Sequence, residues 1–303
     1  MTRPTWMAVW VAAAVGCGGE SDPPVSPSLC GGQPGYCDRP YNEVSQVCTH
    51  NAMSNVADGF VFPTPNQTPG LTRQLDDGVR CLMLDTYWHE DEASLCHGAC
   101  GLWGVRPLHD GLVEVRAWLE AHPTDIVAFI LEAYLDEEQT SQALTDAGLA
   151  PYLYRHAGLG TPWPTYGEMI AGDERLVVFT DDADSVESWH LDWRTHGWET
   201  PFNDESFTCD PGRGEPTAAE HQVFILNHYT LCGGGGCPEN AVVNNDYDGL
   251  LERALSCSEA DPVRNPGGQI PTFVNVDHYD VPVEGGTSEE ADVFEVVRAL
   301  NER

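Results

Sequence analysis

Two histidines of this chain stand where an apolar run gives way to polar residues. His50 ends the run at 44–50, and His97 lies in a turn bracketed by Cys96 and Cys100, past a second apolar run at 79–84. The unperturbed pKa of imidazole is about 6.5, so a histidine can give or take a proton near neutral pH. Such side chains just past buried strands are typical of active sites, and the pair indicates general acid–base chemistry.

The same pattern recurs along the chain. Six short apolar runs predict buried strands, at 44–50, 79–84, 126–131, 176–180, 222–226 and 272–276. A polar side chain stands at or just after the end of each run; in order these are His50, Asp85, Glu132, Asp181, Asn227 and Asp277. In a closed barrel of parallel strands, these strand ends form one rim, where active sites lie.

Helical segments must connect these strands. The spacing of apolar residues predicts helices at 71–77, 109–121, 137–148, 246–256 and 288–301. Strands that alternate with helices indicate parallel βαβ units. We therefore predict an α/β fold, a TIM-type (β/α) barrel stabilised by disulfides. An irregular barrel and an open doubly wound sheet remain alternatives. Residues 57–70 and 86–107 are predicted as loops, and residues 183–216 follow no clear period.

The cysteine count indicates an oxidising compartment. The chain has 11 Cys, and setting Cys17 aside leaves an even number. Neighbours in sequence suggest three pairs, and the remaining four residues suggest two more, although connectivity does not follow from sequence. The expected pairs are Cys30–Cys37, Cys96–Cys100, Cys232–Cys237, Cys48–Cys81 and Cys209–Cys257. A zinc cluster is a weaker alternative because no CxxC pair is present.

The first residues predict an export signal. Arg3 precedes an apolar segment at 6–15 that is too short to span a bilayer. The small residues before Cys17 resemble a bacterial lipobox, so we predict a lipoprotein-type signal peptide over 1–17 and membrane association through a lipidated Cys17. An ordinary secretory signal is the alternative. Either places the protein outside the cytoplasm, as a cell-envelope lipoprotein or a secreted protein. We expect a flexible tether over 18–40 and one barrel domain over 41–303.

The strongly negative net charge of the chain argues against polyanionic partners. The formal net charge is −34, and all 14 basic residues are Arg. Such a surface repels phosphate backbones, so we expect no nucleic-acid partner. An acidic surface also serves solubility, and we expect a monomer.

Four segments in order carry a family resemblance. They are THNAMS, QLDDGVRCLMLD, CHG and an apolar strand that ends in Glu. Together they resemble the catalytic X region of phosphatidylinositol-specific phospholipase C. The resemblance covers about residues 41–135, and VNVDHYD resembles the closing strand of that family, whereas residues 183–220 match nothing in it.

The resemblance implies a two-histidine mechanism on a phospholipid or related phosphodiester. His50 matches the base that takes the proton of the attacking inositol hydroxyl, and His97 matches the acid that protonates the leaving oxygen. Asp277 is the candidate for orienting His50 through its other ring nitrogen. A cyclic inositol phosphate is the implied product.

The resemblance also implies a cation site. Asn51, Asp85 and Glu132 match metal ligands of the calcium-dependent branch, and oxygen ligands suit Ca²⁺. Met83 stands where that branch has another acid, so we predict weak Ca²⁺ binding and leave Mg²⁺ and metal-free catalysis open. The acids could instead pair with Arg80 or with helix N-termini.

Two other functions remain alternatives. The first is a glycerophosphodiester or sphingolipid phosphodiesterase, which shares a barrel, two histidines and a cation; Met83 argues mildly against it. The second is an inactive surface-binding lipoprotein on the same barrel, which the presence of both histidines argues against.

Overall fold

The structure is a computed structural model. It describes Met1 and residues 29–33, 35–61, 64–182, 184–202, 205–218, 221–281 and 291–303. The predicted signal peptide and Cys17 lie outside the described residues.

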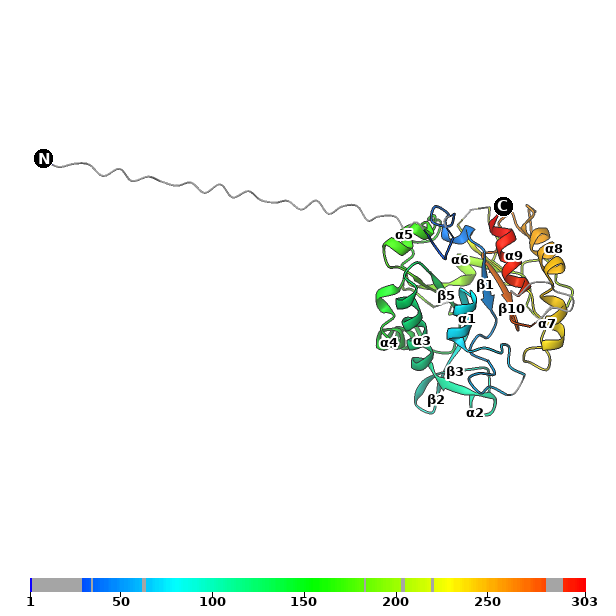
Figure 1. The fold of residues 1–303 in the computed structure, drawn as a ribbon, viewed down its shortest axis with the longest axis horizontal. Coiled ribbons are helices and arrows are strands. Elements are labelled where there is room, and N and C mark those ends of the chain that lie inside the picture. Colours follow the sequence, from blue (N-terminus) through cyan, green and yellow to red (C-terminus); the bar gives the residue numbers. More distant parts are fainter. Residues whose placement is uncertain are drawn as a thin grey trace.

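Eight parallel strands form one curled sheet (Figure 1). Their order is β7–β6–β5–β2–β1–β10–β9–β8. They span β1 Gln46–Thr49, β2 Cys81–His89, β5 Val127–Ala133, β6 Leu176–Thr180, β7 His190–Asp192, β8 Gly197–Glu199, β9 Val223–Asn227 and β10 Phe273–Val276. Within the described residues, the two end strands β7 and β8 do not pair with each other. The fold is therefore an irregular (β/α) barrel, as predicted.

Strand alternation divides the core into two clusters. Along β2, Cys81 belongs to a cluster inside the barrel, whereas Leu82 and Leu84 belong to a cluster between the sheet and the helices. β5 repeats this pattern, with Ile130 inside and Leu131 outside. Because successive side chains of a strand point to opposite faces, the residue type at each position is set by its period of two.

In the part of the chain that the structure describes, helices pack against the sheet, five of them on its outer face, whereas Tyr166 and Trp193 of two others belong to the cluster inside the barrel. These helices are α1 Leu71–Asp77, α3 Leu108–Ala121, α4 Glu137–Asp146, α5 Tyr166–Ala171, α6 Trp193–His196, α7 Pro238–Asn244, α8 Tyr247–Ser258 and α9 Asp292–Asn301, with 3-10 turns η1 Tyr41–Glu43 and η2 Ala150–Tyr152. Local chemistry sets their ends: Asp136 and Gln139 form a capping box at the start of α4. Gly78 ends α1 at φ 114°, a left-handed conformation that favours glycine.

The predicted loop over 86–107 is wrong. β2 continues to His89 and turns back as β3 (Glu92–Cys96), which pairs in turn with β4 (Val105–Pro107). The short helix α2 (Cys100–Trp103) joins β3 to β4. Polar and aromatic residues dominate this stretch because it leaves the barrel wall, so the apolar pattern that marks buried strands is missing. Residues 183–216, which followed no period, supply β7, α6 and β8.

All five expected disulfides are present, from Cys30–Cys37 to Cys232–Cys237. The tether predicted over 18–40 is wrong for its last part. Cys30 is fully buried, and the backbone N–H of Gly31 donates to the carbonyl of Thr124. The Cys30–Cys37 disulfide gives this Gly- and Pro-rich segment a fixed shape that composition alone did not indicate.

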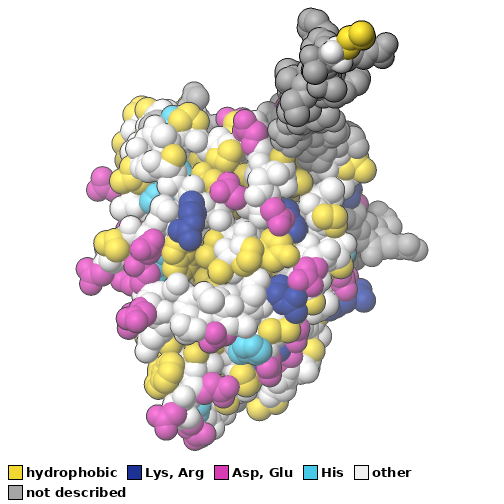
Figure 2. All heavy atoms as spheres, turned by 90° about the vertical axis from the view of Figure 1, so that its left-hand side faces the viewer, with side chains coloured by type: hydrophobic (Ala, Val, Ile, Leu, Met, Phe, Trp, Pro, Cys, Tyr) yellow, Lys and Arg dark blue, Asp and Glu magenta, His cyan; other side chains and the backbone are white. Residues whose placement is uncertain are grey.

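Acidic side chains are spread over the face shown in Figure 2, among apolar and neutral ones, and Arg side chains are few. That face has no basic stripe of the kind that binds nucleic acid. Among the described residues, no helix is both long and apolar enough to cross a membrane.

Candidate active site

The six predicted strand-end residues lie on the inner side of one barrel rim. Asp85 and Glu132 are direct neighbours on the parallel strands β2 and β5. Thr49 of β1 pairs with Leu82 of β2. The next two residues after Thr49, His50 and Asn51, therefore lie at the same rim as the end of β2. On each strand, every second side chain points into the barrel, and the polar residue at the strand end is the next one in that series.

His50 has the surroundings of a base. Its Nδ1 lies 2.9 Å from Oδ1 of Asp277, which is 3% exposed. A carboxylate on Nδ1 holds the proton there and leaves Nε2 bare. The ring stacks on Tyr229 at 3.9 Å between centroids and 10° between planes. The expected Asp277–His50 contact is therefore present, and Tyr229, which sequence reasoning did not single out, fixes the plane of the imidazole.

His97 comes from outside the barrel wall. It follows β3, inside the small ring closed by the Cys96–Cys100 disulfide. The edge of its ring meets Trp103 at 6.0 Å between centroids. Gly98 takes φ 70°, and a Cβ there would lie 2.5 Å from the Trp103 side chain, so only glycine fits. Burial first, and then the neighbouring His50, lower the pKa of His97 to about 4.

Asn51 links the histidine side of the rim to the acidic side. It adopts φ 44°, a left-handed conformation that Asn tolerates better than most residues. Its Nδ2 lies 3.3 Å from Nε2 of His97 and 3.3 Å from Oδ1 of Asn66. Both hydrogen bonds use the nitrogen, and none of the described residues donates to Oδ1. The amide oxygen is therefore free to serve as a ligand.

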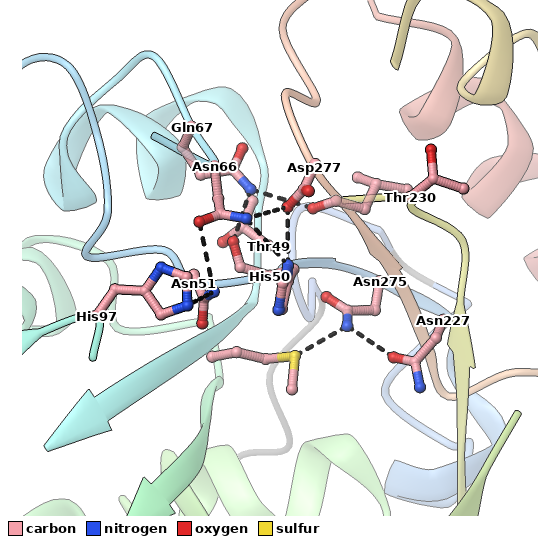
Figure 3. Close-up of polar contacts among 12 residues, drawn as sticks. Thr49, His50, Asn51, Asn66, Gln67, His97, Asn227, Thr230, Asn275 and Asp277 are labelled. Carbon is pink, nitrogen blue, oxygen red and sulfur yellow. Dashed lines mark hydrogen bonds and ion pairs between the residues drawn. The ribbon is translucent and has the colours of Figure 1, made fainter. Parts of the chain in front are cut away.

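The loop predicted over 57–70 contributes buried site residues, which corrects its reading as a surface loop. Asn66 and Gln67 are fully buried, and Gln67 Nε2 donates to the carbonyls of His50 and Val276. Asn66 lies between Asn51 and Asp277 (Figure 3). The prolines around them are typical of exposed loops, so no local signal distinguishes these two amides.

Asp85 is a buried acid without a hydrogen-bond donor among the described residues. It is 2% exposed. Burial first, and then the charges of Glu132 and Asp181, raise its pKa well above the usual range. Glu132 is exposed and accepts a hydrogen bond from the Tyr134 hydroxyl, whose ring stacks on Tyr87. Asp85 and Glu132 are neighbours across the β2–β5 pair, and two carboxylates of like charge suit a hard divalent cation.

The floor of the rim is neutral where a further acid was expected. Met83 points its sulfur at Nδ2 of Asn275, 2.8 Å away, and the same nitrogen donates to Oδ1 of Asn227 at 2.8 Å. Asn227 in turn donates to Glu199, which also binds Arg213. Within the described part of the chain, no three His, Cys, Asp or Glu side chains gather as they would around a metal ion. The oxygen set here has two acids and one amide.

Comparison with known proteins places this chain in a family. The sequence pattern of the family described as PI-PLC X 1 matches residues 36–286. A PI-PLC X domain-containing protein 1 of Arthroderma benhamiae is 33% identical over 66% of this chain and 68% of its own length. An uncharacterized secreted protein of the same organism is 28% identical over 92% of the chain. The chain belongs to the PI-PLC X family. The chain spans 65% of the length of the uncharacterized secreted protein, which is therefore longer than the region it shares with this chain.

Solved structures agree on the fold. The phosphatidylinositol-specific phospholipase C of Listeria monocytogenes superposes with a TM-score of 0.59 over 88% of this chain and 96% of its own, at 12% identity. A variant of the Staphylococcus aureus phosphatidylinositol-specific phospholipase C gives 0.54 over 86% and 92%, also at 12% identity. At this identity the likeness establishes the barrel and nothing finer.

Proposed function

We propose that this protein is a phosphoric diester hydrolase or lyase of the phosphatidylinositol-specific phospholipase C type. The observation that carries the proposal is the pair of histidines at the mouth of a barrel of this family. One is bound to Asp277, and the other is held by Asn51. The substrate class is an inositol phospholipid or a related phosphodiester.

The two histidines have different tasks. Nε2 of His50 takes the proton of a substrate hydroxyl whose oxygen attacks phosphorus. His97 gives a proton to the oxygen that leaves with diacylglycerol, and a cyclic phosphodiester remains. His97 is neutral in the resting site because its pKa is lowered to about 4. The anionic phosphodiester favours the protonated imidazole, so substrate binding and protonation of His97 are coupled.

A divalent cation fits the acidic side of the rim. Asn51 through its oxygen, Asp85 and Glu132 would hold it. When bound, it supplies positive charge that stabilises the phosphate as negative charge develops. Only two acids contribute, because Met83 replaces a third. We therefore expect Ca²⁺ to bind weakly, at about 10⁻⁴–10⁻³ M, with Mg²⁺ as the alternative ion.

The test is turnover of phosphatidylinositol, a glycerophosphodiester and sphingomyelin, each with EDTA and with added Ca²⁺. We expect phosphatidylinositol cleavage that EDTA lowers and millimolar-range Ca²⁺ restores, the range in which weak extracellular sites fill. His50→Ala and His97→Ala should each lower kcat by roughly 10²–10⁴. Near-full activity in either variant would exclude the two-histidine mechanism. Preference for another diester would favour the second phosphodiesterase class.

We further propose export with lipidation of Cys17. Five disulfides are what an oxidising compartment maintains, and one relative is described as secreted. The expected mature N-terminus is a lipid-modified Cys17. Mass spectrometry of the mature protein decides this, because cleavage elsewhere with an unmodified thiol contradicts it.

A further inference from the structure

We propose that Asn66 is a positioning residue that sets the proton positions of both histidines. The kinetic consequence rests on the proposed function, whereas the hydrogen bonds themselves do not. Asn66 contacts neither a reacting group of the substrate nor a cation in this scheme. Its Nδ2 lies 3.2 Å from Nδ1 of His50, and it also acts through Asp277 on one side and through Asn51 on the other.

The backbone of Asn66 is fixed by three separate segments. Its N–H donates to the carbonyl of Ser54 at 2.9 Å, and its carbonyl accepts from the N–H of His278 at 2.8 Å. Gly236 approaches so closely that a Cβ there would lie 2.8 Å from the Asn66 Cα. The side chain is fully buried. These contacts fix where the side chain lies, and its two amide ends are set by their partners, Asp277 at Nδ2 and Asn51 at Oδ1.

On the donor side, Asn66 controls the carboxylate that orients the base. Its Nδ2 lies 3.0 Å from Oδ1 of Asp277, the same oxygen that His50 Nδ1 approaches to 2.9 Å. Oδ2 of Asp277 is buried, without a partner among the described residues. Two N–H donors thus converge on one oxygen and prevent the carboxylate from turning. Nδ2 of Asn66 could donate to Nδ1 of His50 only if that nitrogen were bare, but Nδ2 has the closer carboxylate of Asp277 as its acceptor. This arrangement favours the proton of His50 on Nδ1 and leaves Nε2 bare for the substrate.

On the acceptor side, Asn66 sets which way the Asn51 amide points. Oδ1 of Asn66 accepts from Nδ2 of Asn51 at 3.3 Å. If the Asn51 amide turned over, two oxygens would face each other. The amide directs its N–H at Nε2 of His97, also at 3.3 Å. This contact favours the proton of the neutral His97 on Nδ1, which is buried without a hydrogen-bond partner among the described residues. One buried amide thus connects the base to the acid across the rim (Figure 3).

A purely structural role is the competing explanation, and the chain offers a matched control. Asn55 is also fully buried, and its side chain donates to the carbonyls of Ala52 and Met53 and to Asp58. It has no contact with Asp277 or with either histidine. Asn55→Ala and Asn66→Ala therefore each remove a buried amide from the same loop region, but only the second variant touches the histidine network.

The first measurement is a double-mutant cycle with Asp277→Ala, read as kcat and KM separately. Asn66→Ala should lower kcat by on the order of 10–100-fold, in the range of lost supporting contacts at an active site, with KM little changed. In the Asp277→Ala background the same change should cost several-fold less, because residues that act as a unit are not additive. Asn55→Ala should lower stability and give the same kcat factor in both backgrounds.

The second measurement is ¹⁵N NMR of the imidazoles at mildly alkaline pH, above the ordinary pKa of about 6.5 for imidazole. The wild type and Asn55→Ala should show the Nδ1–H tautomer for His50 and His97, and Asn66→Ala should show mixed tautomers. Unchanged tautomers, with an equal kcat loss in both backgrounds, would overturn the positioning role. Mixed tautomers in a protein that cleaves no phosphodiester would uphold it while the proposed function fails.

Discussion

Asp85→Asn should make the metal-free protein more stable at neutral pH. Asp85 is 2% exposed, has no hydrogen-bond donor among the described residues and faces Glu132 and Asp181. The folded state must therefore hold either an uncompensated charge or a proton at this position. Asn has nearly the same shape and carries no charge, so it removes the larger of the two costs. An unsatisfied buried group costs roughly 1–3 kcal/mol. For a domain of this size, each kcal/mol corresponds to about 2–4 °C in Tm.

The pH dependence of the difference identifies its cause. Burial raises the folded-state pKa of Asp85 above its unfolded value of 3.8. The penalty is therefore absent below the unfolded value and grows as pH rises from there toward the folded pKa. The gain in Tm from Asp85→Asn should therefore be larger at neutral pH in EDTA than at acid pH, and it should vanish below pH 3.8. Differential scanning calorimetry across this range measures it.

Added Ca²⁺ should make the wild type more stable than Asp85→Asn, the reverse of their order in EDTA. A ligand that binds only the folded state stabilises it by RT ln(1 + [L]/Kd). A free Ca²⁺ concentration of about ten times Kd therefore stabilises the wild type by about 1.4 kcal/mol. The variant should gain less. Asp125→Asn is the control, because Asp125 is buried but pairs with Arg80 at 2.8 Å and should lose stability at neutral pH. A wild type more stable than Asp85→Asn in EDTA would mean that Asp85 has a partner, and the reasoning would be refuted.

Two further predictions concern the histidines. Burial lowers the pKa of three of them, with values of about 4, 4 and 3 for His97, His156 and His228. Because the folded-state pKa values are lowered, the unfolded chain binds protons at these histidines at a higher pH than the folded chain does. The urea midpoint should therefore fall as pH drops from about 6.5 through 4, and a flat profile would contradict this. Replacing Cys96 and Cys100 by Ser should lower kcat by about tenfold or more, since the ring they close positions His97. The same change at Cys30 and Cys37, on the other end of the barrel, should affect stability but not kcat.

The strand ends could be predicted because one physical rule governs them. Buried parallel strands are continuous apolar runs, and the first polar residue after each run marks the rim, as at Asp85 and Glu132. The barrel and the His50–Asp277 contact follow from this rule and from the family resemblance, and the disulfides follow from the number and spacing of the cysteines. Asn66 could not be predicted, because its role depends on Asp277, 211 residues away, and its own surroundings are those of an exposed Pro-rich loop. The β3–β4 excursion was missed because it lacks a two-sided buried surface.

The position of β1 in the sheet governs when the site can form. β1 pairs on one side with β2, a near neighbour in sequence, and on the other with β10. The His50–Asp277 contact across that second seam joins residues 227 apart. Contacts of such long sequence separation form slowly, and until β10 arrives β1 has an open edge that can recruit other chains. During synthesis there is therefore an interval in which most of the chain exists and the His50–Asp277 contact of the proposed active site does not. Completion of the sheet and formation of that contact are a single event.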